Sequence, residues 1–266
     1  MKKRNIYPLL ILFLVIAFWL FENFYEPKAY DGGNETGKVS PKAQLLSPSS
    51  TTGVVVDHSY YSLSYNERYE QAEWVAYELK KEYLTYDGRK RPYFIVDPLV
   101  RTKSADWRNY KRSGFDRGHL CPAGDMRFSE MAYNQTFYTS NISPQENAFN
   151  GGVWNRLEQK VRYWTKAYGS VFVVTGGVLE KGLQEIGDED VAVPKYFYKI
   201  VVKGDGENLQ VLAFLMPHEE SKLPLEKFVV PVDSLEMMTG IDFFAKLPDT
   251  QEDSLEKKVF IKGWKF

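Results

Sequence analysis

The residues best suited to chemistry lie in one short stretch, Asp116-Arg117-Gly118-His119-Leu120-Cys121-Pro122. A neutral imidazole near pH 7 can take a proton from water when its other nitrogen is held by an acceptor. Arg117 places a fixed cation two residues from His119, which suits a substrate that carries negative charge. The stretch therefore predicts the reacting end of a metal-dependent phosphodiesterase, which also needs a metal ligand and further phosphate contacts.

A predicted helix over residues 147–168 supplies candidates for both needs. Its apolar residues recur at spacings of three and four, as on one face of a helix: Trp154, Leu157, Val161 and Trp164. Asn150 offers a neutral oxygen to a hard divalent cation, Glu158 can hold a metal-bound water, and Arg162 can bind a phosphate oxygen. Their offsets of eight and four residues predict that all three side chains project from nearly one side.

Each of these residues also has an ordinary structural interpretation. A lone histidine is more often structural than catalytic, and Asn150 could simply cap the helix. Glu158 and Arg162 could form a surface i,i+4 pair. His58 and His218 have no motif partners, so we expect structural or surface roles for them.

Three blocks of sequence together resemble the DNA/RNA non-specific endonuclease family of the ββα-metal superfamily. They are Asp116-Arg117-Gly118-His119, Ser140-Asn141-Ile142-Ser143-Pro144-Gln145, and Asn150-x-x-x-Trp154-x-x-Leu157-Glu158-x-x-x-Arg162. The resemblance implies an α+β fold of the ββα-metal nuclease type. Its central, mostly antiparallel sheet would be flanked by helices, and the metal-site helix would follow the strand region that carries Asp116 to His119.

The resemblance also implies roles for single residues at the reaction centre. His119 matches the general base, Asn150 the direct protein ligand to Mg²⁺, and Glu158 the acid that acts on the metal through water. Mn²⁺ is an alternative ion. The catalytic set implied in this way is His119, Glu158, Arg162 and Arg117.

Three arginines are the implied contacts to nucleic acid. Arg117 and Arg162 match phosphate-contacting arginines of the family. A further arginine is expected upstream of the motif, and we assign it to Arg91 because Tyr93-Phe94 and Asp97-Pro98 follow it. Arg89 stays open as the alternative.

The function implied is metal-dependent hydrolysis of phosphodiester bonds in DNA and RNA, to 5′-phosphorylated products and with little sequence preference. The alternative from another class is a catalytically silent, membrane-tethered protein that only binds nucleic acid. A pure binder needs the arginines but not His119, which argues against it. The resemblance also leaves a homodimer open.

The composition excludes a protein that attracts nucleic acid through an overall positive charge, because the formal net charge is −1 and the pI is about 6.4. Any such site must be local, and one basic run is visible: Arg101, Lys103, Arg108, Lys111, Arg112 and Arg117. The single cysteine, Cys121, rules out an intramolecular disulfide, and nothing beside it resembles an activated thiol.

The first residues have the pattern of a targeting segment. Met1-Lys2-Lys3-Arg4 precedes a run without charge from residue 6 to 21, which predicts that the chain downstream crosses a membrane. No small-residue cleavage site follows the run, so a signal anchor is favoured over a cleaved signal peptide. The predicted divisions are therefore residues 1–27 (anchor or signal peptide), 28–53 (flexible linker) and 54–266 (nuclease domain), with an extracytoplasmic location, periplasmic or cell-surface.

Within the domain, β-branched and aromatic runs predict strands over residues 54–56, 60–65, 74–79, 171–177, 194–203 and 209–216. The strand at 74–79 competes with a helical pattern of nearly equal quality. Residues 139–145 predict a strand that turns into a loop, and a helix is expected from residue 232 to the Thr239-Gly240 stop.

Overall fold

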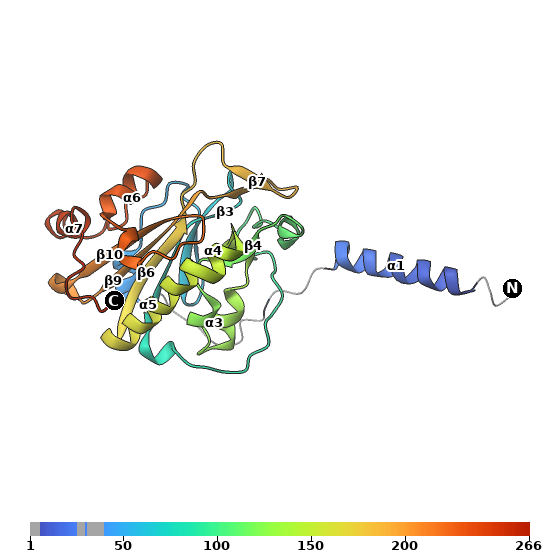
Figure 1. Cartoon of the computed structure of the whole chain (residues 1–266), viewed down its shortest axis with the longest axis horizontal. Helices are drawn as coiled ribbons and strands as arrows, with labels where there is room; N and C mark the ends of the chain where they lie inside the picture. Colours follow the sequence, from blue (N-terminus) through green and yellow to red (C-terminus); the bar gives the residue numbers. More distant parts are fainter. Residues whose placement is uncertain (1–5, 26–29, 31–39) are drawn as a thin grey trace.

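A computed structural model describes residues 6–25, 30 and 40–266, and it consists of one helix followed by an α+β domain (Figure 1). Helix α1 (Ile6–Phe24) projects away from the domain and has no buried residue. By length and composition alone α1 could cross a membrane, a test that signal sequences also pass.

The domain is built on a seven-stranded sheet in the order β1-β2-β3-β6-β9-β10-β11, and every neighbouring pair is antiparallel. Its strands are β1 (Val55–Asp57), β2 (Tyr61–Asn66), β3 (Gln71–Lys80), β6 (Ser170–Gly177), β9 (Tyr196–Lys203), β10 (Gln210–Pro217) and β11 (Val229–Val230). Two further antiparallel pairs lie beside it: β4 (Asp116–His119) with β5 (Ile142–Gln145), and β7 (Gln184–Ile186) with β8 (Val191–Val193).

Both faces of the sheet are buried, and alternate residues of a strand serve different cores. In β3, Val75 and Tyr77 belong to one apolar cluster, whereas Trp74 and Ala76 belong to the other. A strand buried on both faces has a nearly continuous apolar sequence, which is why this segment resembled a helix. The predicted strand over residues 74–79 is confirmed.

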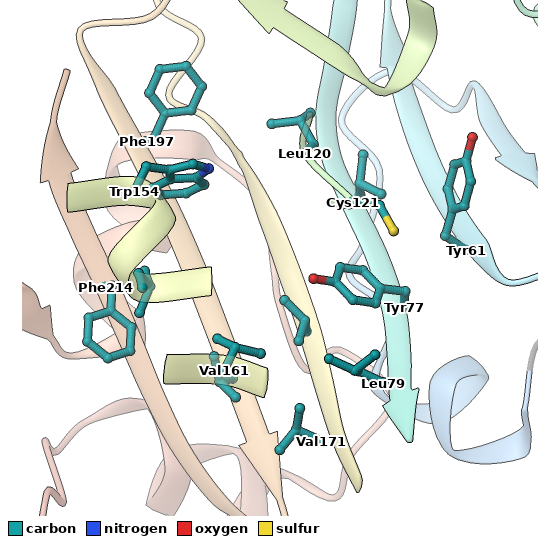
Figure 2. Close-up of a cluster of buried hydrophobic side chains, with 14 of the residues drawn as sticks. Tyr61, Tyr77, Leu79, Leu120, Cys121, Trp154, Val161, Val171, Phe197 and Phe214 are labelled. Atoms are coloured by element: carbon teal, nitrogen blue, oxygen red, sulfur yellow. The ribbon is translucent and has the colours of Figure 1, made fainter. Parts of the chain in front are cut away.

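Different helices cover the two faces. Helix α5 (Asn155–Tyr168) packs its apolar side on the first face, where Figure 2 shows Trp154 beside Phe197, with Val161 and Phe214 in the same layer. The second face is covered by α2 (Pro41–Leu46), α6 (Val232–Thr239) and α7 (Asp249–Glu256). This is the arrangement that the sequence predicted, an antiparallel sheet flanked by helices.

The single helix predicted over residues 147–168 is wrong in its first part. It begins as α4 (Asn147–Phe149), widens into a π-helical turn (Asn150–Trp154) and becomes regular only in α5. Gly152 has non-helical angles (φ −99°, ψ −112°), and a Cβ there would lie 1.7 Å from Oε2 of Glu220. That carboxylate accepts the N–H of Val153 at 2.9 Å, so Glu220 holds the backbone of the irregular turn ahead of the regular helix.

The predicted linker over residues 28–53 extends too far. Residues 28, 29 and 31–39 lie outside the described part of the chain, but residues 40–53 pack against the domain. Ala43 and Leu46 of α2 are buried in the second core. The carbonyl of Ser49 accepts the indole N–H of Trp74 at 2.8 Å. The polar composition of this segment misled the prediction, because a few apolar residues and backbone hydrogen bonds hold it.

A smaller difference concerns residues 130–145. Helix α3 (Glu130–Gln135) comes first in this segment. The expected order of strand and then loop over residues 139–145 is reversed: a 3₁₀ turn (Thr139–Asn141) leads into β5. Pro144 does not end the strand, although its ring leaves it without an N–H to donate.

Gly176 lies inside β6 and allows a close backbone approach. A Cβ at this position would lie 2.3 Å from the carbonyl oxygen of Glu73 on β3. We expect Gly176→Ala to lower the free energy of unfolding by about 1–3 kcal/mol, because the two strands must separate. Urea denaturation measures the change, with Gly88→Ala as control because a Cβ there would meet nothing within 4 Å. Equal unfolding midpoints for the two variants would contradict the prediction.

Candidate active site

The candidate site is built on the pairing of β4 with β5, which aligns Asp116 with Gln145 and His119 with Ile142. Only glycine fits at position 118, because a Cβ would lie 2.2 Å from the side chain of Gln145. Two of the three sequence blocks are thus joined by backbone hydrogen bonds.

The side chain of Asn141 stabilises the chain where it leaves the β4–β5 pair. Its Oδ1 accepts the N–H of Cys121 at 2.8 Å, and its Nδ2 donates to the carbonyls of Cys121 (3.0 Å) and Thr136 (2.9 Å). Asn141 is fully buried, so these bonds satisfy all of its polar atoms inside the core. The chain therefore leaves His119 through a fixed corner.

His119 lies in an aromatic cage. Its ring centroid is 4.8 Å from that of Phe137 and 5.5 Å from that of Phe94. The Nε2 atom is buried and has no hydrogen-bond partner within the described chain. Burial and the nearby Arg91 guanidinium lower the pKa of His119 to about 3, so the imidazole is neutral at physiological pH.

Two arginines stack on the same aromatic group. Cζ of Arg91 lies 5.2 Å from the ring centroid of Phe94, and Cζ of Arg117 lies 4.8 Å from it. Arg117 is also 5.7 Å from the ring of Trp107. A pocket of about 380 Å³ opens here, and Arg91, Phe94, Trp107 and Arg117 are among its lining residues. Two cations therefore line a cavity against Phe94, a ring that His119 also contacts.

The structure distinguishes between the two upstream arginines. Arg89 forms ion pairs with Asp87 and, at 3.8 Å, with Glu130, and it donates to the carbonyl of Arg127. Arg91 instead lies close enough to His119 to act on its pKa. The assignment of Arg91 rather than Arg89 to the site fits this geometry.

Asn150 is held by Asp116. Oδ2 of Asp116 accepts from Nδ2 of Asn150 at 3.0 Å and from Nδ2 of Asn147 at 3.1 Å. An amide that donates through Nδ2 to a carboxylate turns its Oδ1 away, which leaves that oxygen for a cation. Asp116 had no predicted role, and it positions Asn150 rather than pairing with Arg117.

A Mg²⁺ ion fits this set of donors. Within the described residues, no group of three or more acidic, histidine or cysteine ligands converges at Asn150. Mg²⁺ usually keeps several waters and takes one or two protein oxygens, so a single amide oxygen with a carboxylate further out suits it.

Glu158 and Arg162 belong to a network of buried charges under the site. Arg162 donates from Nε to Asp125 at 2.6 Å, and its Nη2 lies 3.5 Å from Glu158. Burial raises the pKa of Glu158 to about 7, although Lys199 and Arg162 act to lower it. Arg162 is therefore committed to two carboxylates, in addition to its predicted role at phosphate.

Lys199 is a member of this network that the sequence did not reveal. It is fully buried on β9, and its Nζ lies 4.6 Å from the ring centroid of Trp154 and 3.2 Å from Oγ1 of Thr175. Burial lowers its pKa. A lysine within the apolar run Tyr196-Phe197-Tyr198-Lys199-Ile200-Val201-Val202 was the available signal, because unpaired lysines are rarely buried.

The remaining histidines and the cysteine have structural surroundings. His58 pairs with Asp97 at 2.8 Å, and neither side chain is exposed. His218 accepts the N–H of Glu146 through Nε2 at 2.7 Å, and its Nδ1 lies 2.8 Å from the carbonyl of Pro194. Burial raises the pKa of the Cys121 thiol, as expected for a thiol that is not activated.

Known proteins share both the sequence and the fold of this chain. Human mitochondrial endonuclease G is 37% identical over 201 residues, which cover 69% of this chain and 67% of the relative. Zebrafish mitochondrial nuclease EXOG is 32% identical over 249 residues, covering 87% and 72%. A chain in the crystal structure of the EndoG/EndoGI complex has 34% identity and a TM-score of 0.67, covering 74% of this chain and 88% of that one.

These comparisons correct one prediction and support others. Human endonuclease G and zebrafish EXOG are mitochondrial nucleases, so the predicted extracytoplasmic location, periplasmic or cell-surface, is contradicted. The relatives are nucleases, which disfavours the silent nucleic-acid-binding alternative.

The family model for DNA/RNA non-specific endonucleases matches residues 40–250, a range that includes α2 and the whole candidate site. With the ββα-metal fold shared with EndoG, this match shows that the chain belongs to the DNA/RNA non-specific endonuclease family.

Proposed function

We propose that the protein is a Mg²⁺-dependent endonuclease that hydrolyses DNA and RNA with little sequence preference, to 5′-phosphorylated products. The observation that carries the proposal is the grouping of a neutral His119 with Arg91 and Arg117: all three side chains lie against Phe94, at a pocket that the two arginines line. Contacts from arginine to phosphate do not distinguish one base from another, which agrees with a low sequence preference.

His119 acts as the general base in this proposal. Its neutral imidazole accepts a proton from the water that attacks phosphorus. A pKa of about 3 makes a weak base; burial is the larger cause of that low value and the charge of Arg91 the smaller one. A bound phosphate would offset the second cause only.

The other residues bind and orient. Arg91 and Arg117 hold phosphate oxygens while stacked on aromatic rings, which keeps their guanidinium groups in place. Asn150 would hold Mg²⁺ directly and Glu158 through a water, with Mn²⁺ as the alternative ion. Bound there, the ion would polarise a phosphate oxygen and stabilise the leaving 3′ oxygen. Arg162 orients Glu158 through their ion pair.

Helix α1 supports attachment to a membrane, because it is apolar along its length and no residue of it is buried in the domain. The mitochondrial relatives favour a mitochondrial location for the protein.

Replacing His119 with Ala should lower the rate of plasmid cleavage about 10²–10⁴-fold, because the proton acceptor is lost. The melting temperature should stay close to that of the parent, since the ring makes no hydrogen bond through Nε2. The assay uses Mg²⁺ with and without chelator. Parental cleavage rates in His119→Ala would refute the base, and absence of cleavage by the parent with any divalent ion would refute the nuclease proposal.

Arg91→Ala should reduce cleavage about tenfold to a hundredfold, the worth of one charge-assisted hydrogen bond to phosphate. Arg89→Ala is the matched control, because that arginine lies two residues away but is paired with Asp87 and Glu130. Its cleavage rate should stay near the parental value. A larger loss in Arg89→Ala than in Arg91→Ala would reverse the assignment.

The low pKa of His119 should also appear in the pH dependence of stability. The unfolded chain protonates this group near pH 6.5 and the folded chain only near 3, so its contribution to stability falls as the pH drops between these values. The slope is at most about 1.4 kcal/mol per pH unit. Urea unfolding between pH 4.5 and 6.5 should give a shallower dependence for His119→Ala than for the parent. Parallel curves would mean that His119 titrates normally.

A further inference from the structure

The helices on the second face of the sheet carry a cluster of carboxylates far along the chain from the nuclease residues. Helices α6 and α7 lie at one end of the domain, away from β4 (Figure 1). Their apolar residues, Leu235 and Leu255 among them, belong to the second core, whereas α5 packs on the first. The cluster is therefore separate from the candidate active site.

Five carboxylates meet in two overlapping groups. Oxygens of Asp233, Glu236 and Glu256 all lie within 4.8 Å of one another. Oxygens of Asp242, Glu252 and Glu256 do the same. Glu256 is common to both groups, so it lies at the centre of the cluster.

Glu256 differs from an ordinary surface carboxylate because its side chain is buried. It is only 7% exposed, and its Oε1 is buried without a hydrogen-bond partner within the described residues. A buried carboxylate oxygen that lacks a donor is costly. Carboxylate oxygens of Glu256 also lie within 4.8 Å of oxygens of the four other acids, so a bound cation would offset this charge.

The surrounding charges reinforce this conclusion. Burial, followed by the charges of Glu236, Glu252, Asp233 and Asp242, raises the pKa of Glu256 to about 8. The nearby Lys257 pairs with Asp253 at 2.7 Å, outside both groups, and its charge also acts on Asp233 and Glu256. Glu236 receives one hydrogen bond, from the backbone N–H of Phe243 at 2.9 Å, and protonation would allow another between Glu236 and Glu256.

We propose that this cluster, Asp233, Glu236, Asp242, Glu252 and Glu256, binds Ca²⁺ as a structural ion. All donors are hard oxygens, and Ca²⁺ takes six to eight of them at about 2.3–2.6 Å. Mg²⁺ usually keeps several waters and is bound by one or two carboxylates, so a cluster of five carboxylates suits Ca²⁺ better.

The site would join three consecutive parts of the C-terminal region. Asp233 and Glu236 belong to α6, Asp242 to the connection after it, and Glu252 and Glu256 to α7. An ion held between them would oppose the repulsion that otherwise pushes α6 and α7 apart. The inference concerns stability and does not depend on the proposed nuclease activity.

The test compares the full-length parent with Glu256→Gln, which keeps the shape of the side chain but removes its charge. Both proteins are stripped of metal with chelator and titrated with CaCl₂ while thermal unfolding is followed. For the parent we expect a Kd below about 1 mM. At a hundredfold excess over Kd, its melting temperature should rise by about 5 °C or more.

Glu256→Gln should lose most of this rise, whereas Asp253→Asn, on the same helix but outside both groups, should keep it. Binding of Ca²⁺ at the nuclease site is common to all three proteins and cancels in the comparison. Cleavage of DNA by Glu256→Gln in Mg²⁺ should equal that of the parent. If Glu256→Gln does not fold, the partly exposed Glu252→Gln takes its place.

Two results would overturn the proposal. One is an equal Ca²⁺-induced rise in the parent and in Glu256→Gln. The other is no rise in either, with a parent that gains stability relative to Glu256→Gln as the pH falls from 8 towards 4.5. In that case the carboxylates share a proton instead of a cation, since a raised folded-state pKa favours the protonated folded chain.

Discussion

The candidate site depends above all on the short antiparallel pairing of Asp116–His119 with Ile142–Gln145. Gly118 permits it, since any side chain there would collide with Gln145. Through this pairing His119 reaches its aromatic cage, and Asp116 reaches Asn150 at the start of the helical region. One strand pair thereby links the proposed base, His119, to the proposed cation ligand, Asn150, at the start of the helical region.

A second constraint is the buried charge beneath the site. Asp125, Glu158, Arg162 and Lys199 bring two acids and two bases into the first core, where each charge would be costly alone. Replacing such groups by apolar ones is often neutral for stability. Their presence is therefore better explained by the role proposed for Glu158, a carboxylate that would act on the metal ion through a water.

Much of the fold could be predicted because local patterns agree with the final structure. The runs that became β2, β3, β6, β9 and β10 are rich in β-branched and aromatic residues, and Gly240 ends α6 in the left-handed conformation as a C-terminal glycine should. The interruption at Gly152 could not be predicted in this way. It depends on the carboxylate of Glu220, 68 positions later, whose approach no local pattern encodes.

The sequence by itself determined which residue types are available for catalysis. The spacing of His119, Asn150, Glu158 and Arg162 gave the resemblance to the family. The family model matches residues 40–250, a range that includes all of them. Only the tertiary structure decided their neighbours. It set Arg91 rather than Arg89 beside His119, turned Arg162 towards Asp125, and buried Lys199 and Glu256 among carboxylates. The physical reason is that ionisation and pairing depend on burial and on charges brought together from distant segments, which spacing along the chain does not specify.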